Sequence, residues 1–464
     1  MLFTDINFIF IFLPVVLILY WTLKNANARL WVLLISSYIF YGYWNYKFTF
    51  LLFITTFVDY AIALKIDGTE NKKHKLYYLI LSLTSNLSFL GFFKYYNFFT
   101  DNLNQVLTQL SMQSFFPVLN IVLPVGISFY IFQSMSYTID VYRGVVKSTN
   151  NFIKFASFVA LFPQLVAGPI VRYKDVAEQL NNMSRKFDTY QFTWGLQLFL
   201  LGLFKKVLIA DHLARNISFF FINYKDIGFL EAWAAFLGYA FQIYFDFSGY
   251  SDMAIGLGLL IGLKFPVNFN SPYQALNLAD FWRRWHMTLS SWLRDYLYIP
   301  LGGNRISNSR TVLNVIIVFT LGGLWHGAAW TFILWGLYQG FFIALYQLTQ
   351  KYWDKLPCWF ARLLTFYIVI ISWVLFKSSD LDMVSVMLDK MIFLSGPMYI
   401  LSGQLTLQIL STCFILYLFV ILAPNTNSFK PVKSIPHAMF YAFMFLWSVL
   451  EINSLQLEFL YYQF

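Results

Sequence analysis

The chain has 464 residues, of which 59% are hydrophobic and only 12% charged, and its mean hydropathy is +0.60. A soluble protein of this length could not bury so much apolar surface, since soluble domains carry about 25% charged residues. The formal charge of +10 does not indicate nucleic-acid binding, because the basic residues stand in loops between apolar runs. The composition therefore excludes a soluble enzyme and favours a polytopic membrane protein.

Apolar runs that approach the length of a bilayer crossing, about 20 residues, recur along the whole chain. In chain order they are Ile6–Leu23, Leu30–Trp44, Phe48–Leu64, Leu76–Phe93, Val118–Ile139, Phe192–Ala210, Glu231–Phe247, Val312–Trp325, Thr331–Tyr346, Leu363–Phe376, Leu405–Leu422 and Met439–Leu450. We expect an all-α fold with roughly 10–12 transmembrane or re-entrant helices and further interfacial amphipathic helices. All of them should form one membrane domain over residues 1–464. The first run should not be a cleaved signal peptide, because no basic segment precedes it.

The distribution of lysine and arginine sets the expected orientation in the membrane. Lys24 and Arg29 follow the first run, and a lysine-rich loop at 65–75 follows two runs later. The loop Lys264–Arg310 carries six basic residues against two acidic ones. The positive-inside rule places these loops in the cytoplasm and the N-terminus outside.

The segment Asp280–Pro300 has the pattern of an amphipathic helix. At 100° per residue, one arc of about 120° holds seven residues, namely Trp282, Trp285, His286, Leu289, Trp292, Leu293 and Tyr296. Outside this arc lie Arg283, Arg284, Arg294 and Asp295. The pattern predicts a helix in the membrane surface, with its tryptophans and His286 turned inward and its arginines toward phosphates or the cytosol.

The stretch from Val312 to Gln350 holds no acidic or basic residue and is long enough for about two crossings. His326 lies ~21 Å along a helix from the start of this stretch, more than halfway across the hydrocarbon layer. A polar residue at such depth is costly, so it is a functional candidate. Small residues surround it, namely Gly322, Gly323, Gly327, Ala328 and Ala329, which allow a helix or a ligand to approach closely.

Other polar residues have simpler interpretations. His74 and His437 should be solvated, and His212 should make a local hydrogen bond. The intramembrane acids should join helices or cap helix breaks, although proton relays also use such residues; they are Asp59, Asp140, Asp246 and Asp252. Asp246 and Asp252 flank a segment that we interpret as a polar break. Cys358 and Cys413 indicate neither a disulfide framework nor a metal site, and no P-loop or dinucleotide-binding pattern occurs.

Five motifs carry a resemblance to a known family. They are LPVGISFYIFQSMSYTIDVYRG at 123–144, FPQLVAGPIVRY at 162–173, FDFSGYSDMAIGLGLLIG at 245–262, DFWRRWHMTLSSWLRDYLYIPLGGNR at 280–305 and GGLWHGAAWTFILWG at 322–336. In this order the chain resembles the membrane-bound O-acyltransferase (MBOAT) family, in the branch of the alginate and peptidoglycan O-acetylation proteins. The ending at 459–464 also fits. Teichoic acid D-alanyl transferases are more distant members.

The resemblance implies a function. A cytoplasmic acyl thioester, either acetyl-CoA or an acyl carrier protein, donates its acyl group as a substrate, with no bound cofactor or metal. The protein passes the group across the bacterial inner membrane, and an extracytoplasmic partner, typically of the SGNH type, delivers it to polysaccharide hydroxyls. The implied catalytic residues are His326 and His286, and histidine suits a base near pH 7.

The arginines of the segment 280–305 stand where an anionic donor would dock, although lipid phosphates would attract them equally. We expect the substrates to contact five residues, namely Trp282, Trp285, Arg283, Arg284 and Trp325. Three alternatives stay open: a D-alanyl transferase, an acyl or polysaccharide transporter, and a non-enzymatic export scaffold. The absence of an internal repeat speaks against many transporter folds.

Overall fold

The computed structural model describes residues 1–113, 116–393 and 401–455, and the sequence motif at 459–464 lies outside these residues. Helices form all the regular structure of the described residues, with no strand among them, which confirms the expected all-α class. The chain divides into two compact units, one of Met1–Gly195 with Leu257–Pro266 and one of Leu196–Gly256 with Val267–Phe464. The single membrane domain stays a prediction.

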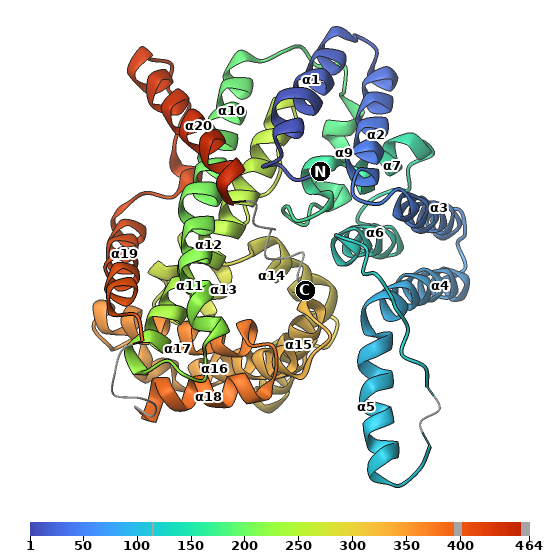
Figure 1. The fold of residues 1–464 in the computed structure, drawn as a ribbon. Helices are drawn as coiled ribbons and strands as arrows, with labels where there is room; N and C mark the ends of the chain where they lie inside the picture. Colours follow the sequence, from blue (N-terminus) through green and yellow to red (C-terminus); the bar gives the residue numbers. More distant parts are fainter. Residues whose placement is uncertain (114–115, 394–400, 456–464) are drawn as a thin grey trace. The chain divides into compact units, whose positions relative to one another are not determined.

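The first unit consists of helices from the N-terminal part of the chain. They are α1 (Leu13–Thr22), α2 (Ala26–Gly42), α3 (Lys47–Asp67), α4 (Lys72–Leu90), α5 (Tyr96–Gln109), α6 (Ile127–Tyr142), α7 (Phe152–Ala160), α8 (Phe162–Leu165) and α9 (Tyr173–Asn181). Helices α3, α4 and α6 pack together, with Asp59 fully buried between them (Figure 1). Its carboxylate accepts hydrogen bonds from Ser82 at 2.6 Å, from Asn86 at 2.8 Å and from Ser134. This acid joins three helices, as expected for a buried polar group that needs partners.

The apolar run Val118–Ile139 does not form one helix. Helix α6 begins only at Ile127, and Pro124 and Gly126 precede it. Proline restricts the preceding residue to extended backbone, and Gly126 has a φ of +74°. A Cβ at Gly126 would lie 2.6 Å from the carbonyl oxygen of Leu165, so only glycine fits this close approach. The predicted span is therefore wrong in its first half.

The second unit holds most of the longer helices. They are α10 (Thr189–Phe204, which starts in the first unit), α11 (His212–Ile222), α12 (Phe229–Leu260, which ends in the first unit), α13 (Leu278–Arg284), α14 (Met287–Leu293), α15 (Asn308–His326), α16 (Trp330–Trp353), α17 (Cys358–Lys377), α18 (Leu381–Phe393), α19 (Gly403–Leu422) and α20 (Ile435–Leu455). Helix α12 runs without interruption through the segment between Asp246 and Asp252, so the predicted polar break is wrong. Gly249 serves close packing instead, since a Cβ there would lie 2.7 Å from the Gly202 carbonyl oxygen of α10.

The acids of α12 make buried ion pairs with a π-helical turn that spans Lys205–Asp211. Lys206 lies 2.6 Å from Asp246 and 2.6 Å from Asp211, and Lys205 lies 2.6 Å from Asp252. The interpretation of these acids as links between helices is confirmed, because each buried charge meets an opposite one.

Helices α15 and α16 form a tightly packed hairpin (Figure 1). The Ser307 hydroxyl caps α15 by accepting from the Arg310 amide at 3.2 Å. A Cβ on Gly323 would clash with the Phe332 carbonyl of α16, and one on Gly336 would lie 2.8 Å from the Cα of Thr320. The small residues near His326 therefore bring two helix backbones together.

Within the described residues, seven helices are long and apolar enough to cross a membrane. They are Lys47–Asp67, Lys72–Gln109, Thr189–Ile222, Trp330–Trp353, Cys358–Lys377, Gly403–Ser428 and Ile435–Ile452. Each contains one of the apolar runs, at least in large part. The remaining five runs coincide wholly or partly with helices that are shorter or less apolar, among them Phe8–Thr22, α2, α6, α12 and α15. The polytopic membrane class is confirmed.

Candidate active site

The segment 280–300 is not the single helix that its periodicity predicts. Helix α13 ends at Arg284, and α14 begins at Met287 after His286, which has a φ of +42°. This left-handed conformation is uncommon outside glycine and costs about 1–3 kcal/mol. Backbone hydrogen bonds from Asn270 to the Arg284 carbonyl and from Met287 to the Asn268 carbonyl, both 2.9 Å, hold the break. Tertiary contacts therefore override the local helical pattern.

The burial predicted for this segment is correct in spite of the break. All seven residues of the apolar arc are buried, and His286 itself has no exposed surface. Arg283 and Arg294 are exposed, whereas Arg284 and Asp295 are half-buried. The position of this segment at a membrane surface stays a prediction.

Asn268 holds the ring of His286 in one tautomer. The Asn268 Oδ1 atom lies 3.0 Å from His286 Nδ1, 3.3 Å from the Thr288 amide and 2.9 Å from the Thr288 hydroxyl. The Thr288 backbone amide can only donate, which fixes the orientation of the Asn268 amide, and the Nδ2 atom donates to the Ser251 hydroxyl at 3.1 Å. Because Oδ1 can only accept, Nδ1 of His286 carries the proton, and Nε2 keeps its lone pair.

Burial lowers the pKa of His286 to about 3, because the charged imidazolium would lose its hydration. The ring is therefore neutral at physiological pH. The edge-to-face contact with Phe247, at 4.7 Å between ring centroids, adds to its apolar surroundings. The lone pair on Nε2 can accept a hydrogen bond from a reacting group, and the low pKa makes this nitrogen a weak base.

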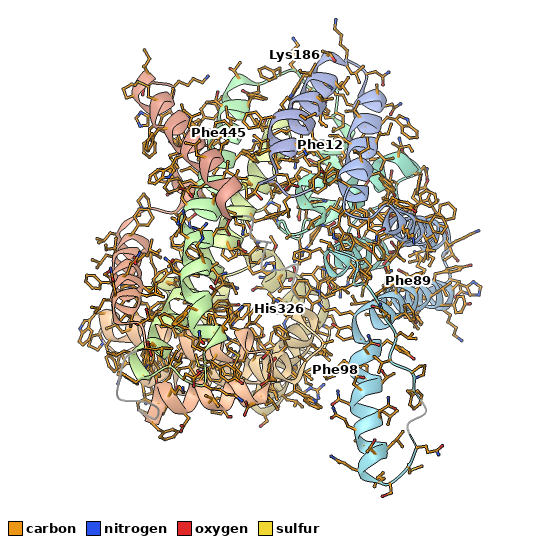
Figure 2. All side chains as sticks on the ribbon, in the orientation of Figure 1. Phe12, Phe89, Phe98, Lys186, His326 and Phe445 are labelled. Atoms are coloured by element: carbon orange, nitrogen blue, oxygen red, sulfur yellow. The ribbon has the colours of Figure 1, made fainter. Side chains whose placement is uncertain are left out.

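His326 is the last residue of α15 and is 4% exposed (Figure 2). Its ring lies among three aromatic rings, with centroid distances of 5.0 Å to Trp325, 5.1 Å to Trp335 and 5.3 Å to Phe376. Helices α15, α16 and α17 each supply one of these rings. The surroundings exclude bulk water and place His326 at the tip of the hairpin.

Trp325 links the two histidines. Its ring lies 6.2 Å from the ring of His286 and 5.0 Å from that of His326, in edge-to-face geometry in both cases. The structure therefore brings together the two histidines and one of the tryptophans that the sequence analysis singled out.

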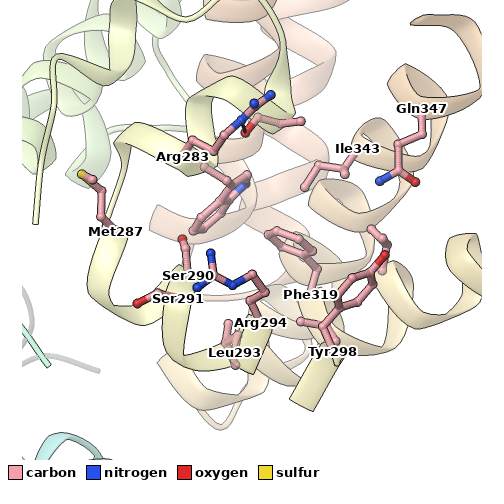
Figure 3. Close-up of a pocket in the computed structure, with 14 residues that line it drawn as sticks. Arg283, Met287, Ser290, Ser291, Leu293, Arg294, Tyr298, Phe319, Ile343 and Gln347 are labelled. Carbon is pink, nitrogen blue, oxygen red and sulfur yellow. Dashed lines mark hydrogen bonds between the residues drawn. The ribbon is translucent and has the colours of Figure 1, made fainter. Parts of the chain in front are cut away.

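A pocket of about 380 Å³ lies between the segment 279–298 and the α15–α16 hairpin. Its walls are largely apolar, and its polar side chains include two arginines, two serines, a tyrosine and a glutamine, namely Arg283, Arg294, Ser290, Ser291, Tyr298 and Gln347. Figure 3 shows the Arg294 side chain pointing into the pocket, on the side of Ser290 and Ser291. This is an apolar cavity with cationic groups at its edge.

Trp282 connects this pocket to His326. It lines the pocket, and its ring lies 5.8 Å from Trp335, which in turn touches His326. The Trp282 indole N–H donates to Gln339 Oε1 at 3.0 Å. Two tryptophan rings therefore separate the pocket from the buried histidine.

Three of the five predicted substrate contacts do not line the pocket, namely Trp325, which lies between the two histidines, Trp285 and Arg284. Trp285 packs into an aromatic cluster, 5.1 Å from Phe269 and 5.1 Å from Trp373. Arg284 pairs with Asp280 at 3.0 Å. For both residues the structure shows packing or a local ion pair, and only Trp282 and Arg283 of that group line the pocket.

Sequence reasoning missed several residues of this region, including Arg294 as a pocket residue and Asn268 as the partner of His286. Nothing local to Asn268 signals its role, since it lies 18 positions before the histidine. Gln339 and Trp335 did carry a signal, because polar atoms inside an uncharged helix are costly without a partner. The other three histidines lie elsewhere: His74 and His437 are exposed, and His212 lies 3.6 Å from Glu451.

Comparison with known proteins decides the family. A profile of the MBOAT, membrane-bound O-acyltransferase family matches residues 15–385. The chain belongs to the MBOAT family. This MBOAT protein is an O-acyltransferase, and its apolar helices and its bacterial relatives make it a multi-pass protein of the bacterial inner membrane.

Its relatives are named for O-acetylation or D-alanylation. The peptidoglycan O-acetyltransferase of Helicobacter pylori is 41% identical over 430 residues, covering 85% of this chain and 80% of that protein. The probable alginate O-acetylase AlgI of Pseudomonas aeruginosa is 44% identical over 394 residues, covering 84% and 75%. The teichoic acid D-alanyltransferase of Bacillus subtilis is 30% identical over 282 residues, covering 56% and 70%.

Proposed function

We propose that this MBOAT protein takes an acetyl group from a cytoplasmic thioester and passes it across the membrane for O-acetylation of an extracytoplasmic polysaccharide. The observation that carries the proposal is the buried pair His286 and His326, which share contacts with Trp325 beside an arginine-edged pocket. Acyl transfer to a hydroxyl needs a neutral base in a site without bulk water.

The pocket suits the donor. Acetyl-CoA and acyl carrier proteins both present their thioester on a slender arm that bears phosphate. Arg283 and Arg294 can bind phosphate at the pocket edge, while the apolar walls accept the arm itself. The positive-inside rule predicts that the loop Lys264–Arg310 faces the cytoplasm, which supports a pocket that opens to the donor side.

The histidines supply the proton transfers. The acyl acceptor attacks through a hydroxyl group. As the hydroxyl oxygen bonds to the thioester carbonyl carbon, His326 accepts the hydroxyl proton. When the tetrahedral intermediate collapses, the carbonyl double bond reforms, the carbon–sulfur bond breaks, and His326 returns the proton to the departing thiolate. His286, neutral and with its lone pair on Nε2, assists by hydrogen bonding from the side of Trp325.

Acetyl is favoured over D-alanyl as the transferred group. The relatives named for O-acetylation match 84–85% of the chain at 41–44% identity, whereas the D-alanyltransferase matches 56% at 30%. The names of those relatives also favour a glycan as the final acceptor. We propose that an SGNH-type partner outside the membrane completes the transfer.

The test uses purified protein in detergent with acetyl-CoA, and separately an acetylated carrier protein, labelled in the acetyl group. His326→Ala should abolish thioester cleavage, a loss of about 10²–10⁴-fold, while His437→Ala, at an exposed site, should keep full activity. Label recovered on His326 would favour an acyl-histidine intermediate over the base mechanism. Full activity of His326→Ala would reject both, and a transporter or scaffold would then be the better description.

A further inference from the structure

Two hydrogen-bond donors on α16 are buried without an acceptor among the described residues. They are the indole N–H of Trp335 and the Nε2 amide group of Gln339, in side chains that are 2% and 0% exposed. The orientation of the glutamine amide is fixed, because its Oε1 already accepts from the donor-only indole of Trp282 at 3.0 Å. Both atoms without an acceptor, Trp335 Nε1 and Gln339 Nε2, are therefore N–H donors.

Leaving such donors unmatched is expensive. A buried donor without a partner costs about 1–3 kcal/mol, and native structures contain few of them. An isolated case invites a water molecule, whereas two adjacent donors of the same polarity suit one oxygen atom that carries or gains negative charge. Trp335 and Gln339 are separated by four positions, so they are neighbours on the helix surface.

Both donors lie between the pocket and the buried histidine, since Gln339 bonds the pocket residue Trp282 and Trp335 contacts His326. Trp335 touches His326 at 5.1 Å between ring centroids. The ridge of α16 that carries Trp335 and Gln339 continues at the same spacing to Ile343 and Gln347, both of which line the pocket. A slender ligand that enters the pocket and extends toward His326 would pass both N–H groups.

We propose that Trp335 and Gln339 bind the carbonyl oxygen of the acyl thioester and stabilise the oxyanion that forms there. This proposal rests on the acyl transfer proposed above and adds the groups that receive the charge. As the hydroxyl oxygen attacks, the electron pair of the carbonyl double bond moves onto this oxygen, and the two N–H groups hold it. The pair returns to the carbon when the carbon–sulfur bond breaks, so no further reactant is needed.

Trp335→Phe tests the first donor, because it keeps an aromatic ring and removes the N–H. Loss of one oxyanion donor lowers kcat by about 10²–10³-fold while KM for acetyl-CoA changes little. Trp373→Phe is the matched control, since Trp373 is about equally buried, stacks on Trp335 at 6.2 Å and lies on α17, outside the ridge of α16 that leads to the pocket. Both variants should lose similar thermal stability, and only Trp335→Phe should lose kcat.

Gln339→Met tests the second donor with an unbranched side chain of similar length. We expect a similar fall in kcat, and a loss smaller than the product of the two when Trp335→Phe is added, because both groups act on one oxygen. Acetyl-CoA with a ¹³C carbonyl supplies a direct measurement. Its isotope-edited infrared carbonyl band should lie at lower frequency in wild-type protein than in either variant.

The outcomes separate this proposal from the function on which it rests. If the wild-type protein is active and both Trp335→Phe and Gln339→Met keep its kcat, the role of the two donors would be overturned and the acyltransferase function would stand. The same holds if the carbonyl band does not differ between wild-type protein and the variants. Equal kcat losses in Trp335→Phe and Trp373→Phe would also overturn it, since packing alone would then explain the effect. No thioester cleavage by the wild-type protein would reject the proposed donor chemistry and this proposal together.

Discussion

Asn268→Ala is the most informative change outside the histidines themselves. Asn268 is fully buried, and its amide makes four hydrogen bonds, to His286, to the amide and hydroxyl of Thr288, and to Ser251. At about 1 kcal/mol for each, the substitution should cost about 4 kcal/mol of stability. It should also remove the hydrogen bond to His286 Nδ1 that selects the tautomer with the lone pair on Nε2.

If His286 acts through Nε2, activity should fall about as far as in His286→Ala, within the roughly 10²–10⁴-fold range of general-base catalysis. The double variant Asn268→Ala with His286→Ala should be no less active than either single variant, because the two residues act as a unit. The assay is acetyl-thioester cleavage by protein that remains monodisperse in size-exclusion chromatography. Thr288→Val is the control, since it removes a bond to the same oxygen and leaves the bond to His286.

Asn268→Asp should restore activity that Asn268→Ala loses, and it should also change the pH dependence of the rate. A carboxylate oxygen can still accept from His286 Nδ1, so the tautomer should be kept. The adjacent negative charge should raise the pKa of His286 by about 1–3, and the acid limb of the pH–rate profile should move to higher pH by a similar amount. Two results would refute the proposed role of Asn268. One is activity losses that multiply when Asn268→Ala and His286→Ala are combined, and the other is an Asn268→Asp variant whose pH–rate profile does not shift.

Three further predictions follow from charge and burial. A single cysteine at Asn308, with both native cysteines replaced by serine, should react only with membrane-permeant reagents in intact cells; labelling by an impermeant reagent would overturn the proposed topology. The pKa of His286, about 3 in the folded state against 6.5 for the free residue, means that the unfolded chain binds more protons between these values. Stability should therefore fall as the pH drops below 6.5, and from pH 7.5 to 5.0 wild-type protein should lose about 2 kcal/mol more than His286→Asn, a difference that thermal unfolding in detergent can detect. Arg283→Gln combined with Arg294→Gln should raise KM for acetyl-CoA with little change in kcat and should weaken the salt dependence of KM; an unchanged KM would remove the arginines from donor binding.

The sequence alone determined the membrane class and the helical segments, because apolar runs and their lengths are local properties. The 3.6-residue periodicity of the segment 280–300 also predicted which side chains are buried, and all seven of them are. The uncharged stretch around His326 marks that residue as a functional candidate from sequence alone, since polar groups are costly in such surroundings. The five motifs indicated the family, which the comparison with known proteins confirms.

Tertiary structure decided the rest, for reasons that local pattern does not contain. The helix break at His286 exists because Asn268 and Asn270, far back along the chain, supply hydrogen bonds that offset a left-handed residue. The continuity of α12 through its polar segment depends on the lysines of a separate helix that neutralise its acids. The donors on α16 stand out only when the folded chain shows that no described acceptor reaches them. Burial follows from periodicity along one segment, whereas hydrogen-bond partners come from segments that only folding brings together.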